Sequence, residues 1–500
     1  MAIDATFIAR ALLKYNYLPF QKRDKSEVPP CFSSRKFTPK IAKLVDASTQ
    51  RKGGWDAISY RATRFNGVPR ILSIPHPVPH ASLSLHIAYS WNELAYITKA
   101  GISEIRPRRH RDGRIVIMDY GRSASNFKKQ YPLSFSRRFR VHTDIANCFP
   151  SIYSHSIPWA TVGFTAAKAQ KTNKNAWFNQ LDELIRFCKR NETNGIAIGP
   201  ATSNVVVESI LAKVDHEMSV THGFIFIRYI DDYTAYCDSE EDAQRFIRLL
   251  GTELDRYKLL LNIKKTRIDQ LPEPIVSSWV SHLSLFFPKK KILNVYDVAH
   301  YISIAQALAK EEPDGSVIKY ALTSLLRAKL KPNAKELLLG EMLVLAYHYP
   351  IIVPMLRMPL RNAVATLTAA QILDFDDRLN ALLENHAYHH RSDSMCWLLF
   401  FISKMKLKVA DKTATRIMES KDCMALLILY KVGNVKQRGA VVSFAKKLDK
   451  TDLYELDTYW LLLYEIFLDG KIANPYGSQE TAFNVMKKSK LTFFHPSVKL

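Results

Sequence analysis

Two kinds of hydrophobic pattern follow each other along the chain. Between residues 60 and 280, stretches in which apolar and polar residues alternate, such as residues 138–143, lie among stretches with helical spacing. After residue 281 apolar residues recur every three or four positions, in stretches of about 15 residues. The pattern therefore predicts an α+β region with an antiparallel sheet, followed by an all-helical region.

The helical region is expected to contain stacked antiparallel helix pairs, because its helical stretches follow one another at about 20 residues. No period identifies a named repeat family. The expected helices span residues 296–310, 317–329, 335–348, 376–390, 411–430 and 452–468.

The chain is interpreted as three parts. Residues 1–55 open with a short helical pattern and continue into a basic, proline-rich stretch, which is typical of an arm. Residues 56–280 form the α+β domain and residues 281–500 the helical domain, whose tail from residue 474 has a loosely structured composition.

A hairpin is predicted around residue 231. Two apolar strands, GFIFIRYI and YTAYC, are joined by Asp231 and Asp232. Ser239, followed three residues later by Asp242, is typical of a helix N-terminus. We therefore expect strand, acidic turn, strand and helix in this order.

The charge balance points to polyanionic partners. The 71 Lys and Arg exceed the 47 Asp and Glu, which gives a net charge of +24, and 47% hydrophobic content is ordinary for a folded chain. Nucleic acids, nucleoside triphosphates and anionic membranes are the candidate partners. The six cysteines form no CxxC pair, and the apolar runs are too short for a membrane span, so we expect a cytoplasmic protein without membrane contact.

Three carboxylates are candidates for metal binding. Asp231 and Asp232 are adjacent like charges, which a divalent cation would hold together. Asp144 ends the alternating stretch at 138–143, so a sheet could bring it beside the hairpin. Three carboxylates on neighbouring strands can hold two Mg²⁺ ions for in-line attack on a nucleotide α-phosphate.

Four sequence blocks in order resemble the reverse transcriptases, and specifically the bacterial antiphage group of abortive-infection (Abi) polymerases. The string HSIPWA and a basic helical C-terminal half in place of a thumb are similar to the Abi group. The blocks are DIANCFPSIY from Asp144, NGIAIGPATSN from Asn194, RYIDDY from Arg228 and LLLNIKKTRI from Leu259.

The resemblance implies a fingers and palm fold, a DNA-synthesising nucleotidyltransferase activity and a set of site residues. Asp144 and Asp231 would bind two Mg²⁺ ions, or Mn²⁺, together with the Ile145 carbonyl, and Asp232 would complete the cluster. The nucleotide contacts implied are an aromatic gate against ribose at Phe149, the Gly-rich block at Gly199, and triphosphate contacts at Arg70 and Lys265.

One departure bears on the template. Templated relatives carry Pro-Gln-Gly where this chain has Ala197, Ile198 and Gly199, and the Abi group is implied to synthesise DNA without a template, starting on a tyrosine of the protein itself. Single-stranded DNA would then be attached covalently. RNA-templated synthesis, with RNA as a partner, and a catalytically idle nucleic-acid-binding defence module are the alternatives.

A priming tyrosine must reach the palm, which favours flexible segments. The candidates are Tyr15, Tyr17, Tyr120, Tyr131 and Tyr476.

Two further expectations concern partners. Residues 106–140 carry eleven Lys and Arg against two Asp, interleaved with aromatic residues, as in a channel for single strands. The helical domain has large apolar residues around Trp397 and Trp460 that predict an interface, and the family suggests a closed homo-oligomer, a trimer in preference to a hexamer.

Overall fold

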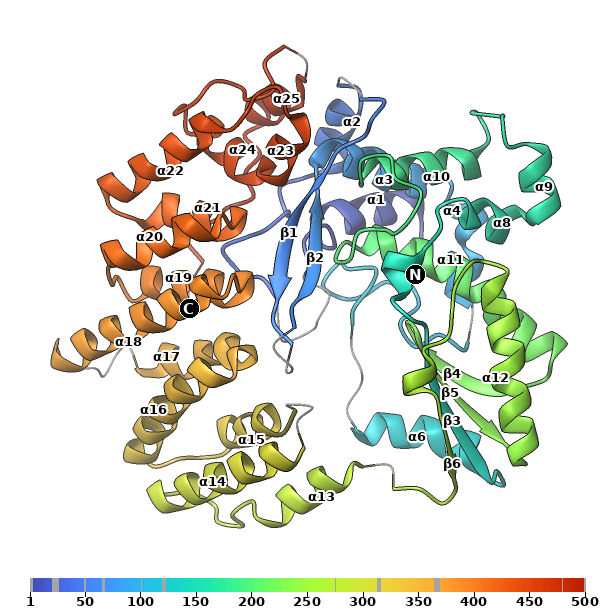
Figure 1. Cartoon of the computed structure of the whole chain (residues 1–500), viewed down its shortest axis with the longest axis horizontal. Helices are drawn as coiled ribbons and strands as arrows, with labels where there is room; N and C mark the ends of the chain where they lie inside the picture. The colour runs from blue at the N-terminus through green and yellow to red at the C-terminus, as the bar shows by residue number, and fades with distance from the viewer. Residues whose placement is uncertain are drawn as a thin grey trace.

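The computed structural model consists of an α+β half and a helical half, with a two-stranded sheet between them (Figure 1). It describes residues 3–19, 27–48, 51–64, 68–99, 101–118, 123–274, 276–312, 316–363, 369–478 and 480–498. The predicted class, an antiparallel α+β region followed by helices, is confirmed. No helix in these described ranges combines the length and the apolar character needed to cross a membrane.

The palm sheet has four antiparallel strands in the order β4-β5-β3-β6. They are β3 (Phe139–Asp144), β4 (Ile225–Tyr229), β5 (Asp232–Cys237) and β6 (Arg267–Gln270). The predicted hairpin is β4 and β5, and the predicted helix is α12 (Glu240–Asp255), where the Ser239 side chain accepts a hydrogen bond from the Asp242 amide. The strand, turn, strand and helix prediction is confirmed.

Further helices complete the α+β half (Figure 1). The longest, α11 (Ala201–His216), is buried along almost its whole length. The others are α3 (Pro77–Tyr89), α4 (Trp91–Leu94), α5 (Tyr96–Lys99), α6 (Ser123–Ser134), α7 (Cys148–Ser151), α8 (Ser156–Val162), α9 (Phe164–Ala169), α10 (Trp177–Phe187), the π-helical turn η1 (Glu217–Thr221) and the 3₁₀ turn η2 (Ile263–Lys265).

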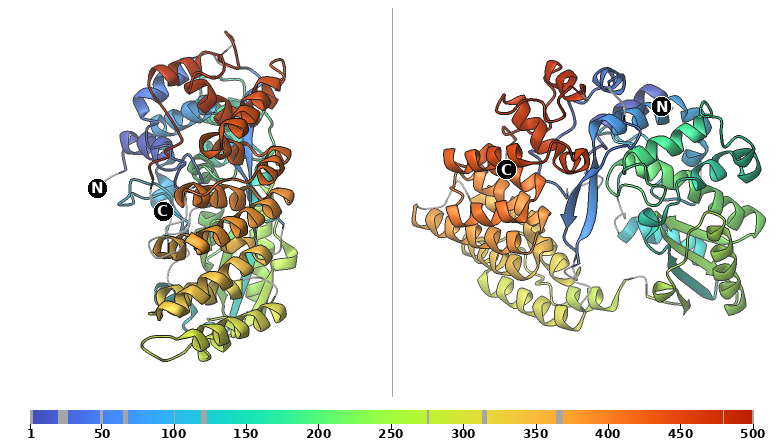
Figure 2. Two further views of the ribbon diagram at one scale, coloured as in Figure 1. Left: turned by 90° about the vertical axis from the view of Figure 1, so that its left-hand side faces the viewer. Right: turned by 45° about the horizontal axis from the view of Figure 1, so that its top comes forward.

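The fingers hairpin consists of β1 (Ala57–Ala62) and β2 (Arg70–Pro75), paired antiparallel with Ala62 opposite Arg70. It lies between the palm and the helical half in Figure 1 and in the right view of Figure 2. Its buried side chains belong to the same hydrophobic core as the C-terminal helices, whereas the palm has a core of its own.

The N-terminal segment packs against both halves. Helix α1 (Ala5–Lys14) buries Phe7, Ile8 and Leu12 in the palm core and packs against α3. The following residues, including Tyr17 and Phe37, enter the core of the helical half, and α2 (Pro39–Asp46) packs against α25. Although interpreted as an arm, this segment is therefore a packed bridge between the two cores.

The C-terminal helical domain stacks its helices in sequence, as the left view of Figure 2 shows. Two expected helices are each divided in two, at 411–430 by Lys421 in the left-handed conformation (φ 52°) and at 452–468 by Tyr459. The elements are α13 (Ser278–Leu285), α14 (Val295–Glu311), α15 (Ser316–Arg327), α16 (Pro332–His348), η3 (Pro350–Leu356), α17 (Arg357–Ala363), α18 (Ala369–Tyr388), α19 (Ser392–Lys404), α20 (Asp411–Ser420), α21 (Cys423–Val432), α22 (Val435–Lys447), α23 (Leu453–Thr458), α24 (Trp460–Leu468) and α25 (Ala482–Lys488).

The apolar residues expected to form an exposed interface lie inside this domain. Trp397 is 3% exposed and Trp460 is fully buried, and their apolar neighbours on α19 and α24 are buried with them. The expectation of a surface patch there is wrong, because helices packed on several sides hide apolar residues that a single layer would expose.

Candidate active site

Asp144 and Asp232 lie opposite each other on two adjacent strands. Strand β3 ends at Asp144, β5 begins at Asp232, and the antiparallel register pairs these two residues directly. The Asp231 carbonyl accepts a hydrogen bond from the Ile145 amide at 3.1 Å. The three carboxylates predicted from the sequence therefore lie together at one end of the palm sheet.

The three carboxylates repel one another in a partly desolvated place. Burial raises the pKa of Asp231, and Asp144 adds to the rise, whereas the positive charges of Arg70 and Lys265 oppose it. Burial, followed by the charges of Asp231 and Asp144, raises the pKa of Asp232 to about 6. Such a cluster stays fully ionised at neutral pH only with cations beside it.

Lys265 supplies one of these cations. Its ammonium group lies 2.5 Å from Oδ2 of Asp144, and this hydrogen bond raises the pKa of the lysine. The side chain is 66% exposed, so it is free to turn toward solvent or a ligand. Lys265, expected to contact a triphosphate, here contacts a catalytic candidate.

Oxygen ligands of this kind suit Mg²⁺ or Mn²⁺. Oδ1 of Asp144 is buried and has no hydrogen-bond partner among the described residues, so it is an unsatisfied acceptor that a cation would satisfy. In the same ranges no three His, Cys, Asp or Glu side chains are arranged to hold a metal ion, and Lys265 contacts the other oxygen of Asp144. The unsatisfied oxygen of Asp144 and the neighbouring carboxylates are donors of the kind that a divalent cation prefers.

The Gly-rich block lies directly against the fingers hairpin. Ser73 of β2 donates its amide proton to the Ile198 carbonyl at 2.7 Å. Gly199 has a φ of +138°, and a Cβ there would lie 3.1 Å from the Ser73 carbonyl oxygen. Only glycine permits this close approach, which joins the palm to the strand that begins with Arg70.

Phe149 is placed differently from an open gate. Its side chain, on α7, is 5% exposed and belongs to the palm core. Its carbonyl accepts a hydrogen bond from the Ile196 amide at 3.0 Å, which ties α7 to the Gly-rich block. A role in sugar selection stays a prediction.

The tyrosine candidates separate by burial. Tyr17 is fully buried, stacks on His80 and donates its hydroxyl to the Pro75 carbonyl. Tyr476 is 3% exposed and donates to Asp457 at 2.8 Å. For these two the expectation of a flexible segment is wrong, because each ring fills a core position. Tyr15 is half-buried beside Gly113, Tyr131 is 68% exposed on α6, and Tyr120 lies outside the described residues.

Part of the basic stretch 106–140 is neutralised by acids. Lys129 pairs with Glu104, Arg137 with Asp238 at 2.6 Å, and Arg140 with Asp269 at 3.2 Å. These pairs attach α6 and β3 to neighbouring palm segments. The interpretation of this stretch as a strand-binding channel stays a prediction.

An ion network beneath the acidic turn was not predicted. Arg228 on β4 is fully buried, and its guanidinium binds both Asp215 oxygens and Glu208 on α11 at 2.7 to 3.0 Å. Burial raises the pKa of Asp215, although Arg228 opposes the rise. Glu208 and Asp215 are seven residues apart, so they share one face of a helix. Arg228 lies within an apolar strand, where a buried cation needs acidic partners. That combination is the signal the sequence offered.

The network also holds the turn. Ile230 has a φ of 61°, which is strained for a β-branched residue and costs on the order of 1 to 3 kcal/mol. Arg228 donates to the Ile230 carbonyl at 2.7 Å. Arg228 therefore stabilises the backbone conformation that places Asp231 beside Asp144.

The part of the chain that contains these acids matches a known protein family. Residues 98–282 match the reverse transcriptase (RNA-dependent DNA polymerase) family. A comparison with curated proteins found no match.

Among solved structures, the chain is similar to telomerases from Candida tropicalis. One is an apo form with 10% identity and a TM-score of 0.31, and the match covers 83% of this chain and 70% of that chain. Another is a complex with a fragment of telomeric RNA, with 10% identity and a TM-score of 0.31, and the match covers 76% of this chain and 66% of that chain. A third is an apo form truncated from its C-terminal domain, with 12% identity and a TM-score of 0.30. The match covers 47% of this chain and 54% of that chain, so the chain spans about half the length of this telomerase. The paired acids Asp144 and Asp232 lie within the matched stretch, and the chain contains a reverse transcriptase domain.

Proposed function

We propose that this chain is a bacterial phage-defence enzyme that adds deoxynucleotides to a growing DNA strand. The observation that carries the proposal is the direct pairing of Asp144 with Asp232, next to Asp231, within the reverse transcriptase stretch. The defence role rests on the resemblance of the HSIPWA string and the helical domain to the Abi group.

The reaction is a phosphoryl transfer. A hydroxyl gives up its proton to solvent and its oxygen bonds to the α-phosphorus of a dNTP, while the bond to the bridging oxygen breaks and pyrophosphate leaves with that electron pair. When bound, two divalent cations lower the pKa of the hydroxyl and neutralise the leaving charge. Asp144, Asp231 and the Ile145 carbonyl would hold them, and Asp232 adds negative charge beside them.

Two side chains are proposed to hold the triphosphate. Arg70 begins β2, the strand whose Ser73 contacts the Gly-rich block, and its positive charge lowers the pKa of Asp231. Lys265 would leave Asp144 and turn to the phosphates when nucleotide and cations bind. In the absence of both, its positive charge offsets part of the negative charge of the acidic cluster.

Synthesis without a template is supported by Ile198. Its side chain is half-buried and packs against both cores. An aliphatic side chain offers no hydrogen bond near the nascent base pair, where templated relatives of the family carry glutamine.

The protein itself is the proposed primer, with Tyr15 preferred. Its ring is half-buried, and it lines the same cavity as Arg70. Tyr131 is the second candidate because it is exposed on α6. Assembly into a closed homo-oligomer, a trimer in preference to a hexamer, is proposed from the family alone.

The test is synthesis by the purified protein with Mg²⁺ and labelled dNTPs and no nucleic acid. We expect label to migrate with the protein after denaturation, and mass spectrometry of digests to find a nucleotide on Tyr15. The Tyr15→Phe variant, which keeps the ring, should lose this label.

Three outcomes would change the proposal. Label on Tyr131 alone would move the primer. Products dictated by added RNA would favour templated reverse transcription. Unimpaired phage protection by a protein lacking Asp231 and Asp232 would favour an idle binding module.

A further inference from the structure

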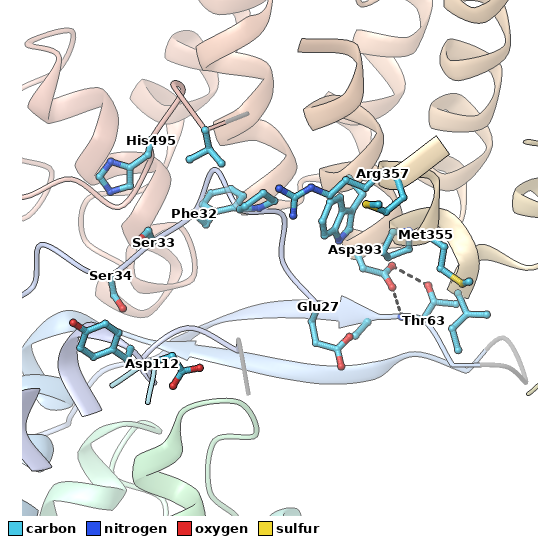
Figure 3. A pocket seen from close by; sticks show the side chains of 18 of the residues that line it. Glu27, Phe32, Ser33, Ser34, Thr63, Asp112, Met355, Arg357, Asp393 and His495 are labelled. Atoms are coloured by element: carbon cyan, nitrogen blue, oxygen red, sulfur yellow. Dashed lines mark hydrogen bonds between the residues drawn. The ribbon is translucent and has the colours of Figure 1, made fainter. Parts of the chain in front are cut away.

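A large cavity lies between the fingers hairpin, the N-terminal segment and the C-terminal helical domain (Figure 3). Its volume is about 1460 Å³, above the roughly 300 to 1,000 Å³ of pockets for small ligands. Ten Lys and Arg line it against three acids. We name it the cationic cavity.

Cations line two opposite walls in rows. On α15, Lys319 and Arg327 are eight residues apart, and on α17 Arg357 and Arg361 are four apart, so each pair shares a helix face. Four residues advance about 6 Å along a helix. Across the cavity, Arg64 lies shortly after the end of β1 and Arg70 begins β2. Such rows suit a ligand with regularly repeated negative charges.

Two of the three acids of the cavity have partners outside α15 and α17. Asp393 accepts hydrogen bonds from the Thr63 amide and hydroxyl at 2.7 and 2.9 Å. Asp112 pairs with Arg114 at 2.7 Å. Within the described ranges, Arg64, Arg327 and Arg361 form no ion pair with a carboxylate. With ten Lys and Arg against three acids, the lining of the cavity carries a net positive charge.

Neighbouring cations in the cavity also repel each other. Burial, and then the positive charge of Arg361, lowers the pKa of Arg357. Beside them Met358 is 49% exposed and Met355 is half-buried. Flexible thioether side chains next to cations provide apolar contact that adapts to different partners.

We propose that the cationic cavity binds single-stranded nucleic acid through its phosphates, without sequence preference. This rests on the proposed function, because the strand would be the product leaving the palm. Arg70 links the two places, since it lines the cavity and acts electrostatically on Asp231. The C-terminal helical domain would thereby form one wall of the product path.

The experiment separates binding from synthesis. In an Asp231→Asn background without Mg²⁺ or dNTPs, fluorescence anisotropy measures binding of a labelled oligo(dT) at several salt concentrations. The cavity variant is Arg357→Gln/Arg361→Gln. The matched control is Lys446→Gln/Lys447→Gln, which removes the same charge from exposed residues of α22. Thermal melting checks that both variants fold.

We expect the cavity variant to bind at least about tenfold more weakly, with a log–log salt slope smaller by about 1.4, since each phosphate contact contributes about 0.7. The control should stay within about twofold. Equal losses in both variants, or none in the cavity variant, would overturn the proposal. So would displacement of the oligonucleotide by micromolar dNTP, which would indicate a mononucleotide site.

The two proposals fail separately. If the protein with Asp231 intact makes no DNA but the cavity variant loses binding, the proposed function fails and the cavity proposal stands. If it makes DNA and the cavity variant binds normally, only the cavity proposal fails.

Discussion

The palm and the C-terminal helical domain place their charges in opposite ways. In the palm, Arg228 is fully buried among Asp215 and Glu208, and the carboxylates Asp144 and Asp232 are fixed by strand register. In the helical domain, Arg327 and Arg361 lie exposed at the cationic cavity, without carboxylate partners in the described ranges. The charges of the palm act through a few close ion pairs of fixed geometry, whereas the charges of the helical domain are spread over the wall of a cavity.

This difference has energetic consequences. A buried charge that loses its partner costs several kcal/mol, because desolvation is no longer compensated. Removal of an exposed cation costs little free energy of unfolding. It also removes one of several positive charges that act together on a ligand. We therefore expect single changes to be severe in the palm and mild at the cavity.

The largest expected effect is at Asp231. Asp231→Asn removes a charge where the transferred phosphate needs a cation, so dNTP incorporation should fall at least about 1,000-fold. The control Asp238→Asn, at the other end of β5, removes an exposed acid that pairs with Arg137 and should keep activity. Activity of Asp231→Asn above about a tenth of wild type would break the comparison.

The second effect is on stability. Arg228→Met leaves Glu208 and Asp215 without their buried partner, so the free energy of unfolding in urea should fall by about 3 to 5 kcal/mol. Arg361→Met, at an exposed position, should change it by less than about 0.5 kcal/mol. Equal losses in the two variants would show that the palm network is not the more demanding region.

The third effect concerns sugar selection. Phe149→Ala should admit rNTPs and reduce discrimination by roughly 100-fold, the scale on which a pocket rejects an added hydroxyl. Ratios of kcat/KM for dNTP and rNTP measure it. Phe149→Leu keeps more bulk and should lie between. Unchanged discrimination in both variants would mean that Phe149 serves only the palm core.

The fourth effect arises where the N-terminal segment meets the helical domain. Glu480 accepts a hydrogen bond from Trp55 at 3.0 Å and lies 3.6 Å from Arg51, and burial raises its pKa to about 7. The folded state thus holds this proton more tightly than the unfolded state. Its contribution to stability is complete at low pH and is lost as the pH rises from about 4.5 to about 7.

His76, 3.3 Å from Glu480, opposes this trend. Burial lowers its pKa well below 6.5, so its contribution to stability grows as the pH rises through 6.5. Glu480→Gln removes only the contribution of Glu480 to stability, which decreases as the pH rises. Relative to wild type, the variant should gain roughly 1 to 3 kcal/mol between pH 5 and pH 8, as measured by urea unfolding. Parallel pH curves would contradict the assignment.

The smallest effect tests whether the cavity distributes its charges. Arg361→Gln alone should weaken oligonucleotide binding about threefold, because it removes one phosphate contact among several. Adding Arg357→Gln should lower binding by a further similar factor. If this single change abolished binding, binding at the cavity would depend on one contact, as the contacts of the palm do, and the contrast between the two regions would be wrong.

The sequence by itself determined the features that are local. The alternation at 138–143, the acidic turn and the Ser239 cap depend on neighbouring residues, and each lies where the pattern predicts. The expected helices lie close to α14, α15, α16 and α18, because helical periodicity is also a local property. Only their ends, and the divisions near Lys421 and Tyr459, differ.

Only the tertiary structure decided which side chains are buried and which charges meet. Tyr17 and Tyr476 belong to polar or proline-rich stretches, yet both fill core positions formed by segments hundreds of residues apart. Trp397 was expected at a surface and lies inside. Some cations of residues 106–140, such as Arg137 and Arg140, pair with acids, while those of α15 and α17 line a cavity. Burial and pairing depend on contacts between distant segments, which no local pattern records.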